Sequence, residues 1–270
     1  MQMGSKSKPA ALAAAVVTLA VLTATAAAQQ TSAASTSATL VYCSDITYPP
    51  EEFYKGTTAA GSDIDIGTAI AKRLGTKAEF ANTGFDGIIA ALLGKKCDAI
   101  ISGMNDTAAR RKQVAFVDYL SVGQSLMVTK GNPHHIAKLA DLSGKSVSVE
   151  VGTTNKGFLD AESKKLKKAG KKAIQVVAFP KDTDAAAALK TGKVDAYFGD
   201  SPVVAYYIAK DSSFAFGGSP INPIPVGIAL RRSDPQLKTK VQKAVDTLYA
   251  NGTMRKILAK WKMSAFALKK

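Results

Sequence analysis

Two segments of the sequence place charged side chains directly after runs that read as strands. The segment Ser102–Asn105 follows one apolar run and precedes Arg110, and Asp200 follows another just before Ser201 and Pro202. A guanidinium can bind a carboxylate through two parallel hydrogen bonds, and a carboxylate can bind an ammonium group. Taken alone, however, Arg110 beside two further basic residues is typical of solvated surface, and Asp200 is typical of a helix N-cap.

The residues that most often catalyse reactions are scarce in this chain. The two histidines, His134 and His135, stand together in a segment that reads as an exposed turn, and neither cysteine has a convincing base partner. No metal-ligand spacing or phosphate-binding loop is present in the sequence. The acids that could still serve as a general acid are Asp45, Glu51 and Asp200. The pattern favours binding over catalysis, and we expect no metal and no cofactor.

The N-terminus has the pattern of an export signal. Lys6 and Lys8 precede an apolar run over residues 11–22, and small residues follow up to Ala28. This order predicts a cleaved signal peptide over residues 1–28, followed by a flexible leader over residues 29–39. An uncleaved anchor is the alternative, but the many Ala and Thr residues of this stretch partition poorly into hydrocarbon. We therefore predict a periplasmic or otherwise extracytoplasmic protein.

The charge of the chain is strongly basic. Its 36 Lys and Arg residues against 21 Asp and Glu residues give a formal charge of +15, which becomes +13 when the two lysines of the signal peptide are removed. The basic residues gather in helical, surface-like stretches such as Lys164–Lys168, without interleaved aromatics or a nucleic-acid motif. They predict a solvated face that anionic membranes attract, and no nucleic-acid partner.

Both cysteines, Cys43 and Cys97, lie in apolar runs of strand length. An oxidising compartment permits a disulfide between them, whereas two buried free thiols are the equally acceptable alternative. Their pairing stays open at this point.

Short apolar runs alternate with helical patterns along the mature chain. The runs that read as strands are Leu40–Ser44, Ala78–Phe80, Ala99–Ser102, Leu126–Thr129, Ser146–Val151, Gln175–Phe179 and Ala196–Gly199. Such alternation predicts an α/β fold with largely parallel sheets.

An internal similarity predicts two related lobes. The segments Ala91–Ala99 and Ala188–Ala196 both combine a helix end, a Gly-containing turn and a strand start, with Leu and Asp six residues apart. We expect two lobes, each with its own sheet. The first lobe comprises residues 40–122 and 227–270, and the second comprises 123–226, with crossings near 120–124 and 224–227. Two crossing strands make a hinge, and facing strand ends make a ligand cleft.

Four segments at predicted strand ends then carry a family resemblance. They are Ser44–Phe53, Gly61–Ile66 with its following helix, Ser102–Lys112, and the pair Val151–Thr154 and Gly199–Pro202. In this order and spacing they resemble the periplasmic amino-acid-binding proteins of ABC importers, which are the bacterial extracellular solute-binding proteins of family 3. The resemblance covers essentially the whole mature chain and implies a two-lobed periplasmic-binding-protein-like fold with a two-strand hinge.

The resemblance also implies roles for individual residues. Arg110 is expected to bind the α-carboxylate of the ligand, and Asp200 the ammonium group from the opposite lobe, so that one zwitterion favours the closed form. Tyr48 and Phe85 match aromatic walls, although Phe85 could equally belong to the core. The remaining expected contacts are polar groups of Asp45, Ser102, Gly103 and Asn105, and backbone donors of Thr153 and Thr154.

Two positions depart from the family pattern. The family usually has an aromatic residue where Glu51 stands and another where Ser62 stands. Glu51 is either a solvated side chain or an acid near the mouth of the pocket that favours a cationic ligand. The identity of the ligand therefore stays open.

The sequence as a whole predicts a monomeric, non-catalytic solute-binding protein. It is expected to capture a small amino acid, with polar or cationic side chains favoured, and to deliver it to the membrane subunits of an ABC permease. One alternative is a dehydratase for small carboxylates, because the same fold carries such enzymes. Another is a soluble sensory domain, although the chain shows no signalling module.

Overall fold

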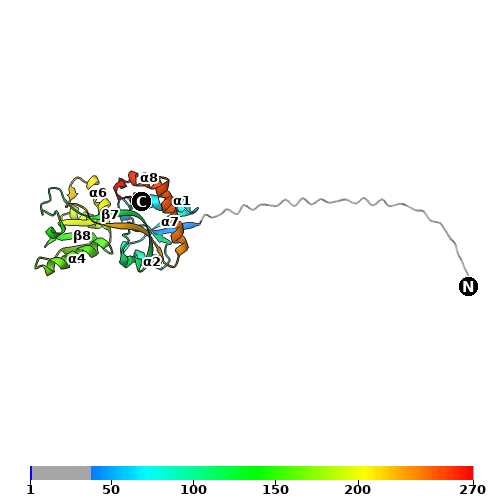
Figure 1. The fold of residues 1–270 in the computed structure, drawn as a ribbon, viewed down its shortest axis with the longest axis horizontal. Helices are drawn as coiled ribbons and strands as arrows, with labels where there is room; N and C mark the ends of the chain where they lie inside the picture. Colours follow the sequence, from blue (N-terminus) through cyan, green and yellow to red (C-terminus); the bar gives the residue numbers. More distant parts are fainter. Residues whose placement is uncertain (2–37, 270) are drawn as a thin grey trace. The chain divides into compact units, whose positions relative to one another are not determined.

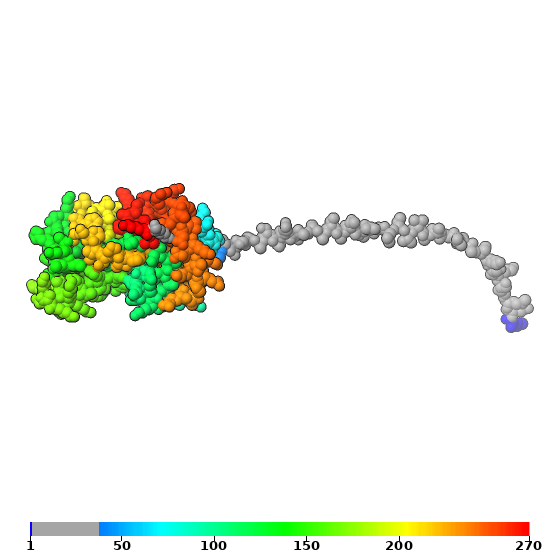
Figure 2. All heavy atoms as spheres, in the orientation of Figure 1, coloured from blue at the N-terminus to red at the C-terminus, as the bar shows by residue number. Residues whose placement is uncertain are grey.

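The structure is a computed structural model that describes Met1 and residues 38–269 (Figures 1 and 2). Apart from Met1, the predicted signal peptide lies outside these residues, as does nearly all of the predicted leader. No helix within 38–269 is both long enough and apolar enough to cross a bilayer.

Nine strands of the described chain form one sheet, and three short strands form another. The large sheet contains β1 (Thr39–Ser44), β5 (Lys77–Asn82), β6 (Ala99–Ile100), β7 (Val114–Thr129), β8 (Ser146–Glu150), β9 (Gln175–Phe179), β10 (Ala196–Asp200), β11 (Phe214–Phe216) and β12 (Ile221–Arg231). The small sheet contains β2 (Thr47–Tyr48), β3 (Glu52–Lys55) and β4 (Thr58–Ala60).

Helices lie between most of these strands in the sequence. They are α1 (Ser62–Arg73), α2 (Ile88–Leu93), α3 (Ala108–Arg111), α4 (Thr154–Lys168), α5 (Asp182–Lys190), α6 (Ser201–Lys210), α7 (Pro235–Ala250) and α8 (Thr253–Lys260), with short 3₁₀ turns at Phe85–Gly87, Leu139–Leu142 and Ser264–Phe266. Every strand predicted from the apolar runs is present, which confirms the α/β class.

Two groups of parallel strands define two lobes. In the first lobe β1 pairs in parallel with β5 and β6, and in the second lobe β8 pairs in parallel with β9 and β10. Figure 1 shows α4 and α6 on one side of the folded residues 38–269 and α1, α2, α7 and α8 on the other side, with β7 running between them. The two-lobed fold predicted from the sequence is confirmed.

Each lobe has its own buried core. Ile66 and Ile70 are one helical turn apart on α1, and they pack with Val245 of α7 in the first lobe. Val147 of β8 packs with Leu159 of α4 in the second lobe. Burying one aliphatic side chain of this size contributes roughly 1.5–3 kcal/mol. The apolar faces of these helices and strands therefore stabilise a separate core in each lobe.

The two lobes are joined by two long strands that pair with each other. β7 is a single 16-residue strand, and its Leu120 and Val122 pair with Val226 and Ile224 of β12 at the crossing. The ladder is therefore continuous through both lobes, and the expectation of a separate sheet in each lobe was wrong in this detail. The reason is that β7 belongs to both lobes. Its residues 114–124 pair with β12, and its residues 124–127 pair with β10.

The internal similarity seen in the sequence corresponds to equivalent structures. Each segment leads from a helix end through a turn to a strand, α2 to β6 in the first lobe and α5 to β10 in the second. The two matching aspartates also make the same bond. Asp98 Oδ2 accepts from the backbone N–H of Val41 in β1, at 3.0 Å, and Asp195 Oδ2 accepts from that of Ser146 in β8, at 2.8 Å.

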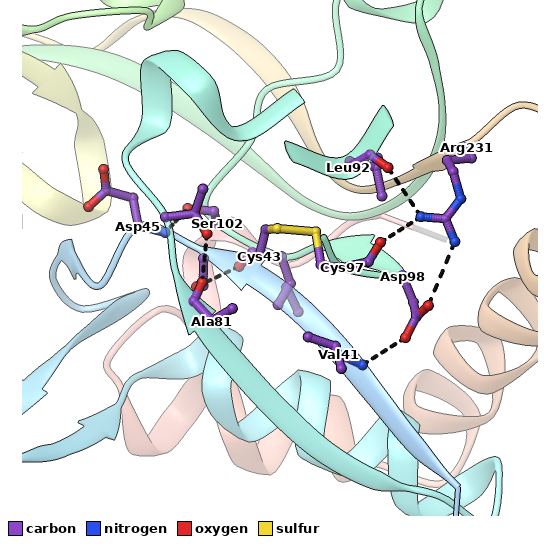
Figure 3. Close-up of a disulfide and its surroundings, with 12 residues drawn as sticks. Val41, Cys43, Asp45, Ala81, Leu92, Cys97, Asp98, Ser102 and Arg231 are labelled. Atoms are coloured by element: carbon purple, nitrogen blue, oxygen red, sulfur yellow. Dashed lines mark hydrogen bonds and ion pairs between the residues drawn. A yellow bond between two sulfur atoms is a disulfide. The ribbon is translucent and has the colours of Figure 1, made fainter. Parts of the chain in front are cut away.

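Cys43 and Cys97 form a disulfide, which settles the question that the sequence left open. Their Cα atoms are 5.6 Å apart, and the bond ties β1 to the turn before β6 (Figure 3). Arg231 of β12 binds the segment around Cys97, since its Nη1 donates to the carbonyl oxygens of Leu92 and Cys97 at 3.2 and 2.5 Å. This cross-linked corner supports the strand end at which Asp45 emerges.

Candidate functional site

A small cavity lies where the carboxyl ends of strands from both lobes meet. Its volume is about 10 Å³. Asp45 follows β1, Gly103 follows β6, Glu150 ends β8 and Asp200 ends β10. The residues that line it are Asp45, Tyr48, Phe85, Gly103, Asn105, Glu150, Thr153, Asn155 and Asp200. Strand ends in α/β sheets are the usual location of ligand sites, and here two such ends face each other.

Arg110 is buried, although the local sequence is typical of surface. The hydroxyl of Thr107 caps α3 by accepting from the Arg110 backbone N–H, and this turns the side chain inward. Its Nη1 donates to the Asn105 carbonyl oxygen at 2.8 Å, and its guanidinium carbon lies 5.3 Å from the centre of the Phe85 ring. Burial lowers the pKa of Arg110, and nearby Asp200 opposes that shift. The guanidinium remains a cation at the edge of the cavity.

The neighbouring Arg111 explains why the sequence pattern was ambiguous. Its side chain is 63% exposed and forms an ion pair with Asp106 at 2.5 Å. Arg111 is therefore the solvated arginine of this segment, and Arg110 is the buried one.

Asp200 occupies the N-cap position of α6, but its side chain makes no capping bond. Its Oδ1 accepts from Asn155 Nδ2 at 3.1 Å, and its Oδ2 accepts from Asn105 Nδ2 at 3.4 Å. Burial raises the pKa of Asp200 to about 6, while the hydrogen bonds from the two asparagines and the charge of Arg110 oppose the rise. The helix-cap interpretation of this carboxylate was wrong, because its oxygens accept from Asn155 and Asn105 and form no capping bond with α6.

Tyr48 and Gly103 form one closely packed wall. Tyr48 is buried, and its hydroxyl accepts from the backbone N–H of Asp200 at 3.2 Å, a bond that joins the lobes. Gly103 has φ +48°, and a Cβ atom there would lie 3.1 Å from two atoms of the Tyr48 ring. The ring reaches this position because residue 103 has no side chain. Phe85 forms the other aromatic wall and lies against Arg110.

Asp45 and Glu150 place two carboxyl groups at the same cavity. Asp45 Oδ2 accepts from the Phe85 backbone N–H at 2.8 Å, and its Oδ1 accepts from the Thr47 hydroxyl at 2.7 Å. Glu150 is 3% exposed, and within the described chain its Oε1 has no hydrogen-bond partner. Burial, together with the charges of Asp182 and Asp45, raises the pKa of Glu150 well above its ordinary value. Two carboxyls that share one buried site favour the uptake of a proton or of another cation there.

Glu51 is buried, so its interpretation as a solvated side chain was wrong. The residue is 2% exposed, and its Oε2 has no hydrogen-bond partner among the described residues. Burial and the charges of Asp63 and Asp200 raise its pKa well above the ordinary value. Glu51 lies behind the cavity wall, because its side chain approaches Gly103 while the cavity lining includes Gly103 but not Glu51.

The structure brings the predicted site residues together. Seven of them line the cavity: Asp45, Tyr48, Phe85, Gly103, Asn105, Thr153 and Asp200. The other three contact lining residues. Ser102 Oγ accepts from the Asp45 backbone N–H at 2.9 Å, Arg110 bonds to the Asn105 carbonyl, and Thr154 Oγ1 donates to Asn105 Oδ1 at 2.5 Å.

Sequence reasoning missed two lining residues, Glu150 and Asn155. Both adjoin a segment that the sequence had singled out, since Glu150 precedes Val151–Thr154 and Asn155 follows it. The end of a strand predicted to reach the cleft was a signal for Glu150. Nothing in the spacing indicated the direction of its side chain.

The histidines lie away from this cavity. His134 Nε2 is 3.0 Å from Asp195 Oδ1, in the second lobe. Across residues 38–269, no group of three His, Cys, Asp or Glu side chains is arranged to hold a metal ion. The groups available for chemistry at the cavity are therefore carboxyls, amides, hydroxyls and one guanidinium.

Comparison with known proteins gives one consistent result. The family model of the bacterial extracellular solute-binding proteins, family 3, matches residues 40–264. The ABC transporter arginine-binding protein 1 of Escherichia coli is 29% identical over 221 residues, which cover 80% of this chain and 87% of that protein.

Two solved structures extend the comparison. An ancestral arginine-binding protein bound to arginine is 37% identical with a TM-score of 0.77, covering 84% of this chain and 99% of that one. An ancestral amino acid-binding protein, a precursor of cyclohexadienyl dehydratase, is 34% identical with a TM-score of 0.75, covering 83% of this chain and 95% of that one.

Proposed function

The chain belongs to the bacterial extracellular solute-binding proteins of family 3, and we propose that it captures a cationic amino acid, arginine first among them, for an ABC importer. Its lobes close around the ligand, and the closed form is what it presents to the membrane subunits of the permease. The observation that carries the proposal is the composition of the cavity, in which three buried carboxyl groups and one guanidinium converge.

The zwitterionic end of an amino acid finds a partner in each lobe. Arg110 offers a planar guanidinium that suits an α-carboxylate, and Asp200 offers a buried carboxylate for the α-ammonium. One ligand bound to both residues favours closure, because its affinity for the closed form exceeds that for the open form.

The side chain of the ligand would then point toward Asp45 and Glu150. A guanidinium or ammonium group there satisfies the unpaired Glu150 Oε1 and offsets the repulsion between the two carboxyls. Tyr48 and Phe85 flank the apolar part of such a side chain. The relatives whose names specify arginine support this choice of ligand.

The cellular setting follows the same reasoning. We expect export by cleavage of residues 1–28 and a periplasmic or otherwise extracytoplasmic location, which suits the Cys43–Cys97 disulfide. We also expect a monomer that meets the permease directly. No cofactor is needed for capture.

A dehydratase is the second candidate function. One solved neighbour is a precursor of cyclohexadienyl dehydratase, and Glu150 is a cavity carboxyl whose raised pKa would suit a general acid. We favour a binding protein without catalytic activity. Incubating the purified protein with prephenate and finding turnover above that of Glu150→Gln would reverse this preference.

Calorimetry with matched ligands tests the proposed specificity. Arginine and citrulline have nearly the same shape but differ in the charge of the terminal group. We expect arginine to bind at least a hundredfold more tightly, about 2.7 kcal/mol, with lysine and ornithine also binding. Equal affinity for citrulline and arginine, or a preference for neutral amino acids, would show that the carboxyl pair does not select a cation.

A further inference from the structure

A chain of side-chain amides runs from the hinge to the carboxylate of Asp200. Asn222 Nδ2 donates to Gln124 Oε1 at 3.3 Å, Gln124 Nε2 donates to Asn155 Oδ1 at 2.6 Å, and Asn155 Nδ2 donates to Asp200 Oδ1 at 3.1 Å. Every amide in this chain donates toward the carboxylate. The direction is fixed at its inner end, because an ionised carboxylate can only accept.

The outer members of the chain belong to the two hinge strands. Gln124 lies on β7, where its cross-strand neighbours are Asp200 of β10 and Ile221 of β12. Asn222 lies on β12, at an irregularity in the pairing between Ile221 and Ile224. The backbone of Asn222 has φ +48°, a conformation that asparagine tolerates better than most residues, and such bulges redirect side chains.

Neither Gln124 nor Asn222 lines the cavity, so neither is placed to touch a ligand there. Gln124 is 1% exposed and Asn155 is 3% exposed, whereas Asn222 is exposed at the outer end. Buried amides of this kind are costly unless all their partners stay in place. Aligned hydrogen bonds also polarise one another, so each amide strengthens the donation of the next.

We propose that Gln124 and Asn222 are positioning residues, which act through Asn155 to hold the Asp200 carboxylate toward the amino group of the ligand and so make that contact depend on the geometry of the hinge. When β7 and β12 change their local conformation, the Gln124–Asn222 bond between them changes first. The orientation of Asn155 and then of Asp200 follows. This inference rests on the proposed function, because it takes the ligand to be an amino acid bound through Asp200.

The test compares two ligands that differ in one group, L-arginine and its analogue without the α-amino group, 5-guanidinopentanoate. Gln124→Met keeps the length of the side chain and removes both hydrogen bonds. We expect it to weaken arginine binding by roughly fivefold to twentyfold, and binding of the analogue by less than about twofold. Glycine tolerates the positive φ at position 222. Asn222→Gly should therefore also weaken arginine binding more than binding of the analogue, with about half the loss of binding free energy that Gln124→Met causes.

Ser121→Ala is the matched control, because Ser121 lies on the same hinge strand but outside the chain of amides. It should leave both affinities unchanged. The melting temperature of each ligand-free variant reports whether the fold is intact. An equal loss for both ligands would mean that Gln124 has only a structural role, and no loss for either would overturn the inference outright.

A second measurement does not need a ligand, so it separates this inference from the proposed function. If arginine does not bind the wild-type protein, the proposed ligand is wrong. The carboxyl group of Asp200 can still be titrated in the wild-type protein and in Gln124→Met, by following the chemical shift of its carbon with NMR. We expect its midpoint to rise by at least about half a pH unit in the variant, because Asn155 is then free to turn its amide away. An unchanged midpoint would overturn the inference.

Discussion

Arg110 of the first lobe donates through Nη2 to the carbonyl oxygen of Gly152 in the second lobe, at 3.2 Å. The same guanidinium faces the ring of Phe85 and bonds through Nη1 to Asn105. Arg110 is therefore one of the residues through which the closed lobes meet. A carboxylate bound to it would be held at the boundary between the lobes.

Replacing Arg110 tests the carboxylate site. We expect Arg110→Lys to weaken amino-acid binding by at least tenfold, because an ammonium cannot reproduce two parallel hydrogen bonds to a carboxylate, a contact worth about 1.5–3 kcal/mol. Calorimetry with arginine measures the loss, and Arg111→Lys is the control because Arg111 is largely exposed. Unchanged affinity in Arg110→Ala would remove this residue from the site.

Asp200→Asn tests the ammonium site. The change keeps the shape of the side chain and removes its charge, so ligand affinity should fall at least tenfold, about 1.4 kcal/mol. The ligand concentration needed for closure, followed by small-angle scattering, should rise in parallel. The ligand-free variant should keep its stability, because the wild-type side chain makes no capping bond. Loss of stability with normal binding and closure would mean that Asp200 is a structural residue.

Much of the fold could be predicted because parallel strands read as apolar runs and the repeat marked the two lobes. One exception was β7, which continues as one strand through Ser121–Gln124, where polar residues and a glycine interrupt the apolar pattern. Pairing with β12 on one side and β10 on the other supplies the backbone hydrogen bonds that make this segment extended. Tertiary pairing decided the conformation, and local propensity did not.

The site was predictable only where a motif matched the family. Arg110 and Asp200 carry no local sign of their proposed roles, since the isolated patterns are typical of a surface residue and of a helix cap. Glu150 and Asn155 were missed because the direction of a side chain at a strand end or helix start depends on the register of neighbouring elements. The burial of Glu51 was equally hidden, because it follows from how the β2–β3 hairpin contacts the second lobe, through Tyr48 in its core and Phe53 against Tyr206.

Gly152→Ala should impair closure. Gly152 has φ +77°, and a Cβ atom there would lie 2.7 Å from the Cα atom of Asp86 in the opposite lobe. We expect ligand affinity to fall at least tenfold, since the closed form can no longer bring these backbones together. Gly170→Ala is a matched control, because Gly170 has φ +71° but nothing within 4 Å. It should cost about 1 kcal/mol of folding stability and leave affinity unchanged, and an equal loss of affinity in both variants would rule out the contact with Asp86 as the cause.

Stability should depend on pH through the buried acids. Burial raises the pKa of Asp200 to about 6 and that of Asp182 to about 7, against about 4 for an unfolded aspartate. The native state therefore binds more protons than the unfolded state. The stabilisation from these groups is fully present below about pH 4 and is lost as the pH rises through 6 and 7. Urea unfolding of the ligand-free protein should show lower stability at pH 8 than at pH 5.

Asp200→Asn provides the control for that pH dependence. The variant should show a smaller decrease between pH 5 and pH 8, because one of the groups that gains a proton in the native state is gone. Arginine affinity of the wild-type protein should change in the opposite direction and weaken as the pH falls through about 6, where Asp200 takes up a proton. Ligand-free stability that rises from pH 5 to pH 8 would contradict the assignment of these shifts.

Glu150→Gln tests which residue selects the charge of the side chain. The glutamine keeps the volume and removes a carboxyl group that ionises when a cation binds beside it, so arginine affinity should fall at least tenfold while citrulline affinity stays the same or rises. Folding stability near neutral pH should not fall, because glutamine resembles the protonated form that burial favours at this position. Glu162→Gln on α4, outside the cavity lining, is the matched control and should alter neither affinity. If Glu150→Gln lowered the affinities for arginine and citrulline equally, Glu150 would contribute to the shape of the cavity but not to the selection of a charged ligand. Asp45 would then be the carboxylate that faces the cationic end of the ligand.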